Sequence, residues 1–248
     1  MAVLVTRPDE RGAQLAEMLI QAGVFAIHLP LFTIEAGREL NALPHKFSQL
    51  KAGDYVFAVS KHAVDYATQT FKNTGFSWRH ELLYFAVGQR TAEYFASQIE
   101  HAIFYPQQQE TSEGLLELAL MQDIADKHIL ILRGNGGREY FSEQAQLRGA
   151  KVDTLECYQR VPIEYNNAEQ MSICKRAGIQ RIVATSAEIL HYLVDFVPES
   201  EHNWLKSCQL VTVSQRLANL AHNLGWQDIV VSPRADNQHL LQTLLCSS

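Results

Sequence analysis

Short apolar runs alternate with longer amphipathic segments along the whole chain. The runs are three to five residues long and lie at residues 3–5, 55–59, 83–87, 129–132, 182–184 and 210–213. Each run is followed by a segment with the character of a helix. Near-continuous apolar strands that alternate with helices are typical of parallel sheets covered on both faces. The pattern therefore predicts an α/β fold.

The chain also repeats itself at a constant offset of 126 residues. The offset aligns residues 58–60 with 184–186, residues 87–92 with 213–218, and Arg7 with Arg133. A solenoid would repeat about every 20 to 50 residues, whereas this longer period indicates two copies of one domain.

The register of the repeat also predicts how the two copies are connected. The strand, turn and helix around Arg7 open the chain, whereas their counterparts around Arg133 close its middle segment. The first copy must therefore be discontinuous. We expect a first lobe of residues 1–33 and 168–248, a second lobe of residues 40–160, and a two-stranded hinge of residues 34–39 and 161–167. The predicted architecture is two similar doubly wound parallel-sheet domains of the flavodoxin-like kind, with the cleft between them as the expected ligand site.

Composition narrows the class of protein. With 248 residues, of which 47% are hydrophobic, the chain can fill two cores. Its formal net charge of -6 argues against broad nucleic-acid binding. The four cysteines have no CxxC spacing, the first residues do not resemble a signal peptide, and no apolar segment reaches the roughly 18 residues needed to cross a bilayer. We expect a cytoplasmic monomer that binds neither membranes nor nucleic acid.

Polar and basic residues gather at the turns that join predicted strands to predicted helices. Helix N-termini present free backbone N–H groups and a partial positive charge, so such turns favour anions. The predicted anion-binding residues are Arg7, Ser60, Lys61, Thr91, Arg133, Gly134, Asn135, Gly136, Arg138, Ser186, Ser214, Gln215 and Arg216. Two plainer interpretations stay open: the hydroxyl residues Ser60, Thr91 and Ser186 can cap helices, and the two equivalent arginines can form structural ion pairs.

The sharpest local feature is the glycine-rich turn at residues 133–138, with the sequence Arg-Gly-Asn-Gly-Gly-Arg. Glycines allow positive φ and a close approach to a ligand. The turn matches neither a Walker loop nor a GxGxxG fingerprint, and it can equally be a plain turn that feeds a helix. The ten histidines form no HExxH motif, so we expect no metal site.

Tyr158 stands where the last strand of the second lobe enters the predicted hinge, so it can face the cleft. An isolated aromatic residue at such a position can simply pack against its neighbours. Its phenol stays protonated near neutral pH and can also donate to a leaving oxygen. Both interpretations stay open.

Taken together and in this order, these motifs resemble the uroporphyrinogen-III synthase family. The resemblance rests on residues 4–8, 57–64, 86–92, 131–139, 157–160 and 224–226, which span essentially the whole chain. It implies two α/β lobes on a two-stranded linker with the first lobe discontinuous. The repeat predicts the same architecture without reference to the family.

The resemblance implies a cofactor-free lyase of haem biosynthesis. Its substrate would be hydroxymethylbilane, a linear tetrapyrrole that the family closes to uroporphyrinogen III with inversion of the last ring and loss of water. The resemblance assigns the family's functional tyrosine to Tyr158 and its middle-domain threonine to Thr91. A second functional threonine would lie near Arg216, where this chain has none. The alternative is a two-lobed module that binds or senses a small anion, against which stand the full-length motif match and the absence of an export signal.

Overall fold

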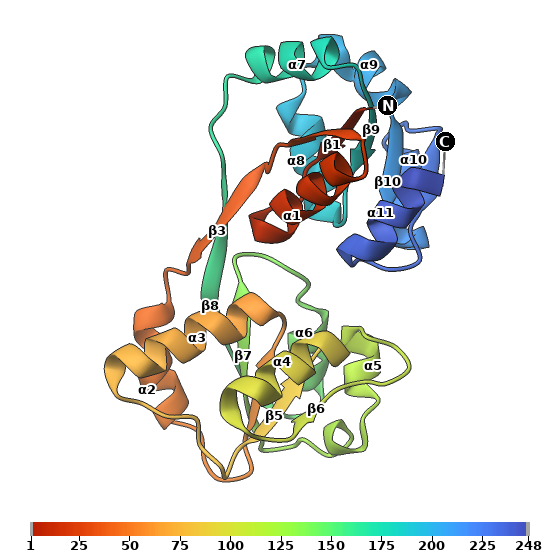
Figure 1. The fold of residues 1–248 in the computed structure, drawn as a ribbon. Coiled ribbons are helices and arrows are strands. Elements are labelled where there is room, and N and C mark those ends of the chain that lie inside the picture. Colours follow the sequence, from red (N-terminus) through yellow and green to blue (C-terminus); the bar gives the residue numbers. More distant parts are fainter. Residues whose placement is uncertain (1, 247–248) are drawn as a thin grey trace. The chain divides into compact units, whose positions relative to one another are not determined.

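A computed structural model describes residues 2–246 and divides them into two compact units (Figure 1). The unit called here the first lobe combines residues up to Ile34 with residues from Val161 onward. The second lobe is the continuous segment Glu35–Arg160. Each lobe is built on a sheet that contains five parallel strands and is flanked by helices, so the predicted fold class, with its discontinuous first lobe, is confirmed.

The first lobe contains a five-stranded parallel sheet in the order β11-β10-β9-β1-β2. Its strands are β1 (Ala2–Val5), β2 (Phe25–His28), β9 (Ile179–Val183), β10 (Gln209–Thr212) and β11 (Ile229–Val231). Its helices are α1 (Asp9–Gln21), α7 (Asn167–Arg176), α8 (Ala187–Phe196), α9 (His202–Ser207), α10 (Gln215–Asn223) and α11 (Asn237–Cys246), with a 3-10 turn at Glu199–Glu201. Counted from its edge, this is the 2-1-3-4-5 order of flavodoxin-like sheets.

Both faces of this sheet are covered, which explains the continuous apolar runs in the sequence. Successive strand residues point to opposite faces. Leu4 and Leu210 pack in a core with α7, α8 and α10. Val3 and Val211 pack in a second core with α1 and α11, which lie together in Figure 1.

Five strands of the second lobe repeat the first-lobe order in a permuted chain, and a sixth strand is added at one edge. Its sheet runs β3-β8-β7-β4-β5-β6. The strands are β3 (Phe32–Ala36), β4 (Tyr55–Ala58), β5 (Leu83–Ala86), β6 (Ile103–Phe104), β7 (His128–Gly134) and β8 (Lys151–Pro162). The helices are α2 (Leu43–Ser48), α3 (Lys61–Thr74), α4 (Gln89–Ile99), α5 (Ser112–Leu116) and α6 (Tyr140–Leu147), with 3-10 turns at Leu40–Ala42 and Ala119–Met121. Under the repeat offset β7 corresponds to β1 and β8 to β2, so both lobes share one topology.

Two cores also flank the second sheet. On one face Phe57 and Ile131 pack against Phe141 of α6 and Leu115 of α5. On the opposite face an aromatic cluster joins the sheet to α3 and α4. Its members are Phe71, Trp78, Tyr84 and Phe95, in edge-on contact.

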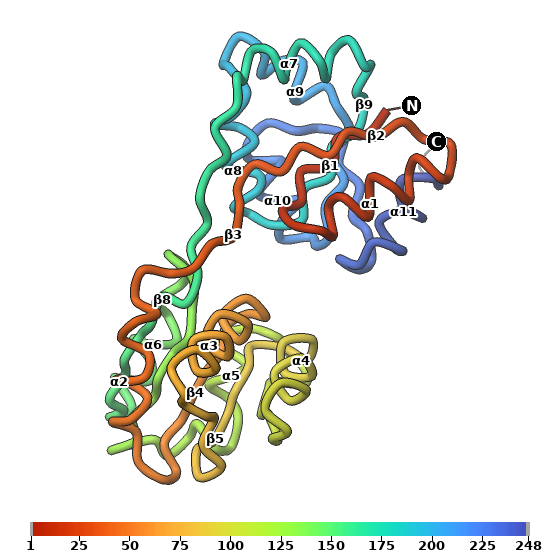
Figure 2. Tube along the Cα trace, turned by 60° about the vertical axis from the view of Figure 1, so that its left-hand side comes forward, coloured from red at the N-terminus to blue at the C-terminus, as the bar shows by residue number. Residues whose placement is uncertain are grey.

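Strands β3 and β8 carry the chain from one lobe to the other. They are neighbours in the sheet and run side by side in both views (Figures 1 and 2). Gly37 N donates to Cys157 O over 2.9 Å, and Ile163 N donates to Leu31 O over 3.1 Å. A Cβ atom on Gly37 would lie 2.1 Å from Glu156 O, so only glycine permits this close pairing. The two-stranded hinge of the predicted fold is therefore present.

No helix within residues 2–246 is long and apolar enough to cross a membrane.

Candidate active site

The carboxyl ends of the second-lobe strands bring most of the predicted site residues to one edge. Strands β7, β4 and β5 are adjacent and parallel. Ser60 follows β4, Gly88 follows β5, and the glycine-rich turn follows β7. Because the carboxyl ends of parallel strands share one edge, these turns face the region where doubly wound sheets bind ligands.

Tyr158 lies at this edge with its ring buried and its hydroxyl held by two donors. The residue is 3% exposed. Ser60 Oγ donates to the phenolic oxygen over 3.1 Å, and Arg160 Nη2 does so over 3.4 Å. The Arg160 guanidinium also lies 5.3 Å from the centre of the Tyr158 ring. Since the phenolic oxygen accepts from both neighbours, its own proton remains to be donated.

The second and third residues of the glycine-rich turn, Gly134 and Asn135, hold this tyrosine. A Cβ atom on Gly134 would lie 2.6 Å from two carbons of the Tyr158 ring, so the close approach that this glycine permits is to the tyrosine. Asn135 N donates to Tyr158 O over 2.9 Å, and Asn135 Oδ1 accepts from Arg160 N over 2.8 Å. The turn therefore fixes the end of β8, and with it the position of the phenol.

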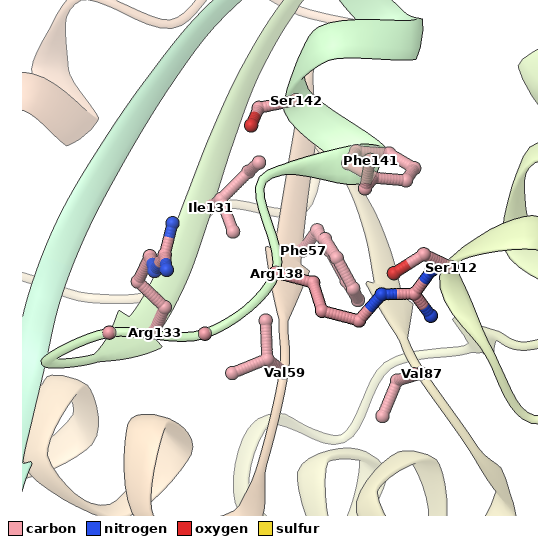
Figure 3. Close-up of a pocket in the computed structure, with 11 residues that line it drawn as sticks. Phe57, Val59, Val87, Ser112, Ile131, Arg133, Arg138, Phe141 and Ser142 are labelled. Atoms are coloured by element: carbon pink, nitrogen blue, oxygen red, sulfur yellow. The ribbon is translucent and has the colours of Figure 1, made fainter.

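The rest of the turn borders a cavity of about 190 Å³ (Figure 3). Gly136 and Gly137 have φ values of +81° and +121°, which favour glycine. The apolar lining residues are Phe57, Val59, Val87, Ile131 and Phe141, and the polar ones include Ser112, Arg133, Arg138 and Ser142. Figure 3 shows Arg138 extending from the turn toward Ser112. The cavity thus combines an apolar lining with two guanidinium groups.

Each of these guanidinium groups is paired with a carboxylate of the same lobe. Arg133 Nη1 lies 2.6 Å from Glu139 Oε1, and Arg138 Nη2 lies 2.6 Å from Glu113 Oε1. The Arg133 side chain is 13% exposed and the Arg138 side chain 63%. The hydrogen bond from Arg138 lowers the pKa of Glu113, and the hydrogen bond from Arg133 lowers that of Glu139. The structural ion pair left open for Arg133 is therefore present.

The amino end of α4 also holds a carboxylate of the chain. Gln89 N donates to Glu110 Oε1 over 3.2 Å. Gly88 is the N-cap residue and makes no side-chain cap, so the carboxylate of Glu110 takes the place of a cap. Thr91 lies in the first turn of α4, is partly buried and does not cap the helix. The helix end that the sequence predicts to favour anions therefore does carry one here.

The predicted serines cap their helices. Ser60 Oγ accepts from Ala63 N, Ser186 Oγ from Ile189 N and Ser214 Oγ from Leu217 N, at 3.3, 3.2 and 3.3 Å. Ser60 also donates to the Tyr158 hydroxyl, so its side chain caps α3 and holds the phenol at the same time.

Lys61 and Arg7 are both held within their own lobes. Lys61 Nζ lies 3.9 Å from Asp65 Oδ2 and 4.6 Å from the centre of the Tyr94 ring. Arg7 is 5% exposed, and its Nη1 donates to Ala235 O over 3.0 Å and to Asn237 Oδ1 over 2.8 Å.

Gln215 and Arg216 lie on the exposed first turn of α10. Gln215 Nε2 donates to Asn219 Oδ1 over 3.0 Å. Among the first-lobe candidates Arg7 is thus buried, the two serines are partly buried, and Gln215 and Arg216 are exposed.

Sequence reasoning missed four residues of the second-lobe edge, namely Arg160, Glu110, Glu113 and Glu139. The position of Arg160 could have been inferred from the sequence, because it lies two residues after Tyr158 on a strand and therefore on the same face. That of Glu113 could not, since 25 residues separate it from its partner Arg138.

The described His, Cys, Asp and Glu side chains do not cluster, and three of the four cysteines are buried. Within residues 2–246 no group of three or more His, Cys, Asp or Glu side chains could hold a metal ion. Cys157, Cys174 and Cys208 are buried. Burial raises the pKa of all three thiols, to about 11 for Cys174 and Cys208, so they stay protonated and are poor nucleophiles.

Comparison with known proteins places the chain in a family. A family model described as uroporphyrinogen-III synthase HemD matches residues 13–242. The chain belongs to the uroporphyrinogen-III synthase family. The uroporphyrinogen-III synthases of Salmonella typhimurium and Escherichia coli are 43% and 42% identical to it over 246 residues, which cover 98% of this chain and 100% of each relative. That of Proteus mirabilis is 44% identical over 194 residues, 78% of this chain and 98% of the relative. The resemblance found in the sequence is confirmed.

Solved structures with this fold include other uroporphyrinogen-III synthases. A mutant of the Thermus thermophilus enzyme superposes with a TM-score of 0.72 at 15% identity and covers 99% of each chain. The enzyme from Helicobacter pylori superposes with a TM-score of 0.61 at 14% identity, covering 100% of this chain and 99% of its own. At such low identity these likenesses support the fold alone.

Proposed function

We propose that this chain closes hydroxymethylbilane to uroporphyrinogen III, inverting the terminal pyrrole ring and releasing water, as a step of haem biosynthesis. The observation that carries the proposal is the identity of 43% to a uroporphyrinogen-III synthase across 98% of this chain and all of the relative. The alternative, a module that only binds or senses a small anion, would not need that correspondence along the full length.

The reaction requires little covalent participation by the protein. A pyrrole nitrogen of the substrate expels the neighbouring hydroxyl and leaves an electrophilic azafulvene. The terminal ring attacks it through its substituted carbon, and the resulting spiro intermediate fragments and recloses with that ring inverted. Because the substrate supplies the electrons, no cofactor is required. A 100-fold preference for inversion needs only about 2.7 kcal/mol of differential barrier lowering, which positioning can supply.

Tyr158 is the proposed donor to the departing hydroxyl. A leaving oxygen needs a proton, and the Tyr158 hydroxyl keeps its proton available while accepting from Ser60 and Arg160. The same two donors stabilise the partial negative charge that develops on the phenolic oxygen as the proton leaves. Gly134 supports this role because it leaves room for the ring.

The substrate carries eight carboxylates, and we propose that the strand-to-helix turns of both lobes bind them. In the second lobe the proposed binding residues are Ser60, Lys61, Thr91, Arg133, Gly134, Asn135, Gly136 and Arg138, and in the first lobe they are Arg7, Ser186, Ser214, Gln215 and Arg216. The capped amino ends of α3, α8 and α10 support this, since each presents backbone N–H groups. The contribution of Arg7 would be indirect, through the segment around Asn237 that it holds.

We further propose that the enzyme works as a monomer in the cytoplasm, without nucleic acid or membrane. Four free cysteines are consistent with a reducing compartment.

The deciding experiment is turnover of hydroxymethylbilane followed by chromatographic separation of the type I and type III products. Without enzyme the substrate closes uninverted, so the wild-type protein should convert most of it to the type III isomer. A protein that binds the substrate and leaves the type I isomer dominant would overturn the proposed function and favour the binding module.

A further inference from the structure

The cavity beside the glycine-rich turn has the size and lining of a site for one small aromatic ring. Its volume is about 190 Å³. An apolar cavity of about 150 Å³ is known to accept benzene. Phe57, Ile131 and Phe141 supply aromatic and aliphatic surface from β4, β7 and α6. A five-membered ring with the first atoms of its substituents therefore fits.

The rim of the cavity carries two cations, and each already binds a carboxylate. Glu139 lies on Arg133 and Glu113 on Arg138, both at 2.6 Å. These carboxylates come from the chain itself, and their side chains are 56% and 34% exposed. Both glutamates can therefore turn into solvent when a carboxylate of a ligand takes their place, which keeps the largely buried Arg133 paired. Ion pairs with such exposed partners are weak, so another carboxylate can compete for the arginines.

We propose that this cavity is the subsite for one pyrrole ring of the substrate, whose two carboxylate arms replace Glu139 on Arg133 and Glu113 on Arg138. The proposal rests on the proposed function, because a tetrapyrrole with eight carboxylates carries two on each ring. The ring enters the apolar cavity, and the two arms exchange one carboxylate for another on each guanidinium. No bond is made or broken.

The exchange would make the subsite selective. In the free protein Glu113 and Glu139 neutralise the two arginines, so a ring with no carboxylate gains no ionic contact by entering. A ring with one carboxylate displaces only one glutamate, and the other stays beside the cavity. Only a ring with two carboxylate arms pairs with both guanidinium groups. Competition from the two glutamates therefore makes the subsite specific for such a ring.

The first test removes the glutamate that pairs with Arg138. Glu113→Gln leaves Arg138 without its carboxylate, so the Michaelis constant for hydroxymethylbilane should fall about two- to fivefold, the measure of a weak ion pair. Glu81→Gln is the matched control. It breaks the Arg79–Glu81 pair, which lies 2.8 Å apart just before β5 and thus at the amino edge of the same sheet. Its Michaelis constant should stay at the wild-type value. An unchanged or raised constant for Glu113→Gln would contradict the proposal.

The second test fills the cavity. Val87→Phe places a ring in the space proposed for the substrate and should raise the Michaelis constant at least tenfold, with the thermal unfolding midpoint checked to exclude misfolding. The Val87 side chain is partly buried at the end of β5, so the larger ring has room to enter the cavity. A folded variant with the wild-type constant would overturn the proposal.

A third measurement detects ligand binding at the subsite without turnover. A monopyrrole that carries one acetate and one propionate arm is titrated into the labelled wild-type protein, alongside its dimethyl ester. The diacid should shift the backbone amide signals of residues 136–138, more strongly in Glu113→Gln, and the ester should not. If wild-type enzyme makes the type III isomer while the diacid shifts nothing, the subsite fails and the function stands. If the diacid binds as described and no type III isomer forms, the function fails alone.

Discussion

Arg7 and Arg133 occupy equivalent positions of the repeat but have different surroundings. Arg7, in the first lobe, is buried and donates to Ala235 O and Asn237 Oδ1. Arg133, in the second lobe, lies on the wall of a cavity and pairs with an exposed glutamate. The duplicated strand and turn place both arginines alike, and the segments packed beside them bury one and leave the other on the wall of a cavity.

The same contrast appears at two further pairs related by the offset of 126 residues. The counterpart of Tyr158 is Phe32, which packs in the first-lobe core 5.1 Å from the ring of Tyr192. The counterpart of Thr91 is Leu217, which is 2% exposed in the same core. At each pair the second lobe has a hydroxyl where the first has an apolar side chain. We infer that the second lobe supplies the proton donor, and that the first lobe contributes mainly backbone groups and exposed polar residues.

The largest expected effect separates the two arginines. Arg7→Ala should lower the free energy of unfolding by about 2 to 4 kcal/mol, because a buried group that makes charged hydrogen bonds is lost and a cavity is left. Arg133→Ala should lower it by about 1 kcal/mol or less, since its partner is exposed. Urea unfolding of both variants measures the difference. Equal losses would remove the distinction between the two lobes.

The next effect concerns the tyrosine. Tyr158→Phe gives the second lobe the residue that the first lobe has, and it should lower turnover about 10- to 100-fold, the low end of general acid assistance for a hydroxyl that also leaves unaided. The product should remain mainly type III, because ring inversion is assigned to positioning. Folding stability should change little, since the ring is kept.

Phe32→Tyr is the converse variant. It adds a hydroxyl within an apolar core and should cost about 1 to 3 kcal/mol of stability with no gain in turnover.

If Tyr158→Phe keeps wild-type turnover while Tyr158→Ala unfolds the protein, Tyr158 is a packing residue like its counterpart.

A smaller effect is expected at the exposed arginine of the cavity. Arg138→Ala should raise the Michaelis constant about three- to tenfold with turnover nearly unchanged, as expected for a charge-assisted contact made equally to substrate and transition state. The matched control is Lys175→Ala on α7 of the first lobe, which breaks an exposed pair with Glu201 of the following 3-10 turn and should leave the constant unchanged. A wild-type constant for Arg138→Ala would make that residue structural.

The smallest expected effect is the pH dependence of stability that Glu113 and Glu139 give the second lobe. Hydrogen bonds from Arg138 and Arg133 hold the pKa values of Glu113 and Glu139 below the ordinary glutamate value. A lowered pKa in the folded state adds stability above the unfolded pKa, and that stability is lost as the pH falls through the folded value. Carboxyl titration by nuclear magnetic resonance should therefore find both midpoints below the ordinary value, and the Glu113 midpoint should return toward it in Arg138→Ala.

Much of the fold could be predicted from the sequence because its signals are local or periodic. Apolar runs mark strands that are buried on both faces, and the repeat register makes the unit at Arg7 equivalent to the unit at Arg133. The α/β class, the shared topology and the discontinuous first lobe all follow from these two patterns. The capping serines also follow, because a helix cap depends on residues three apart.

Only the tertiary structure decided which of the predicted residues line the cavity and which are buried in the fold or cap its helices. Arg7 meets Asn237 across 230 residues, and Arg138 meets Glu113 across 25. Gly134 proved to make room for Tyr158, a residue on the neighbouring strand. The sequence by itself determined the six strongly apolar strands and their alternation with helices, because local periodicity encodes them. The long-range partners of a side chain depend on which distant segments pack together, and that information is absent from any local pattern.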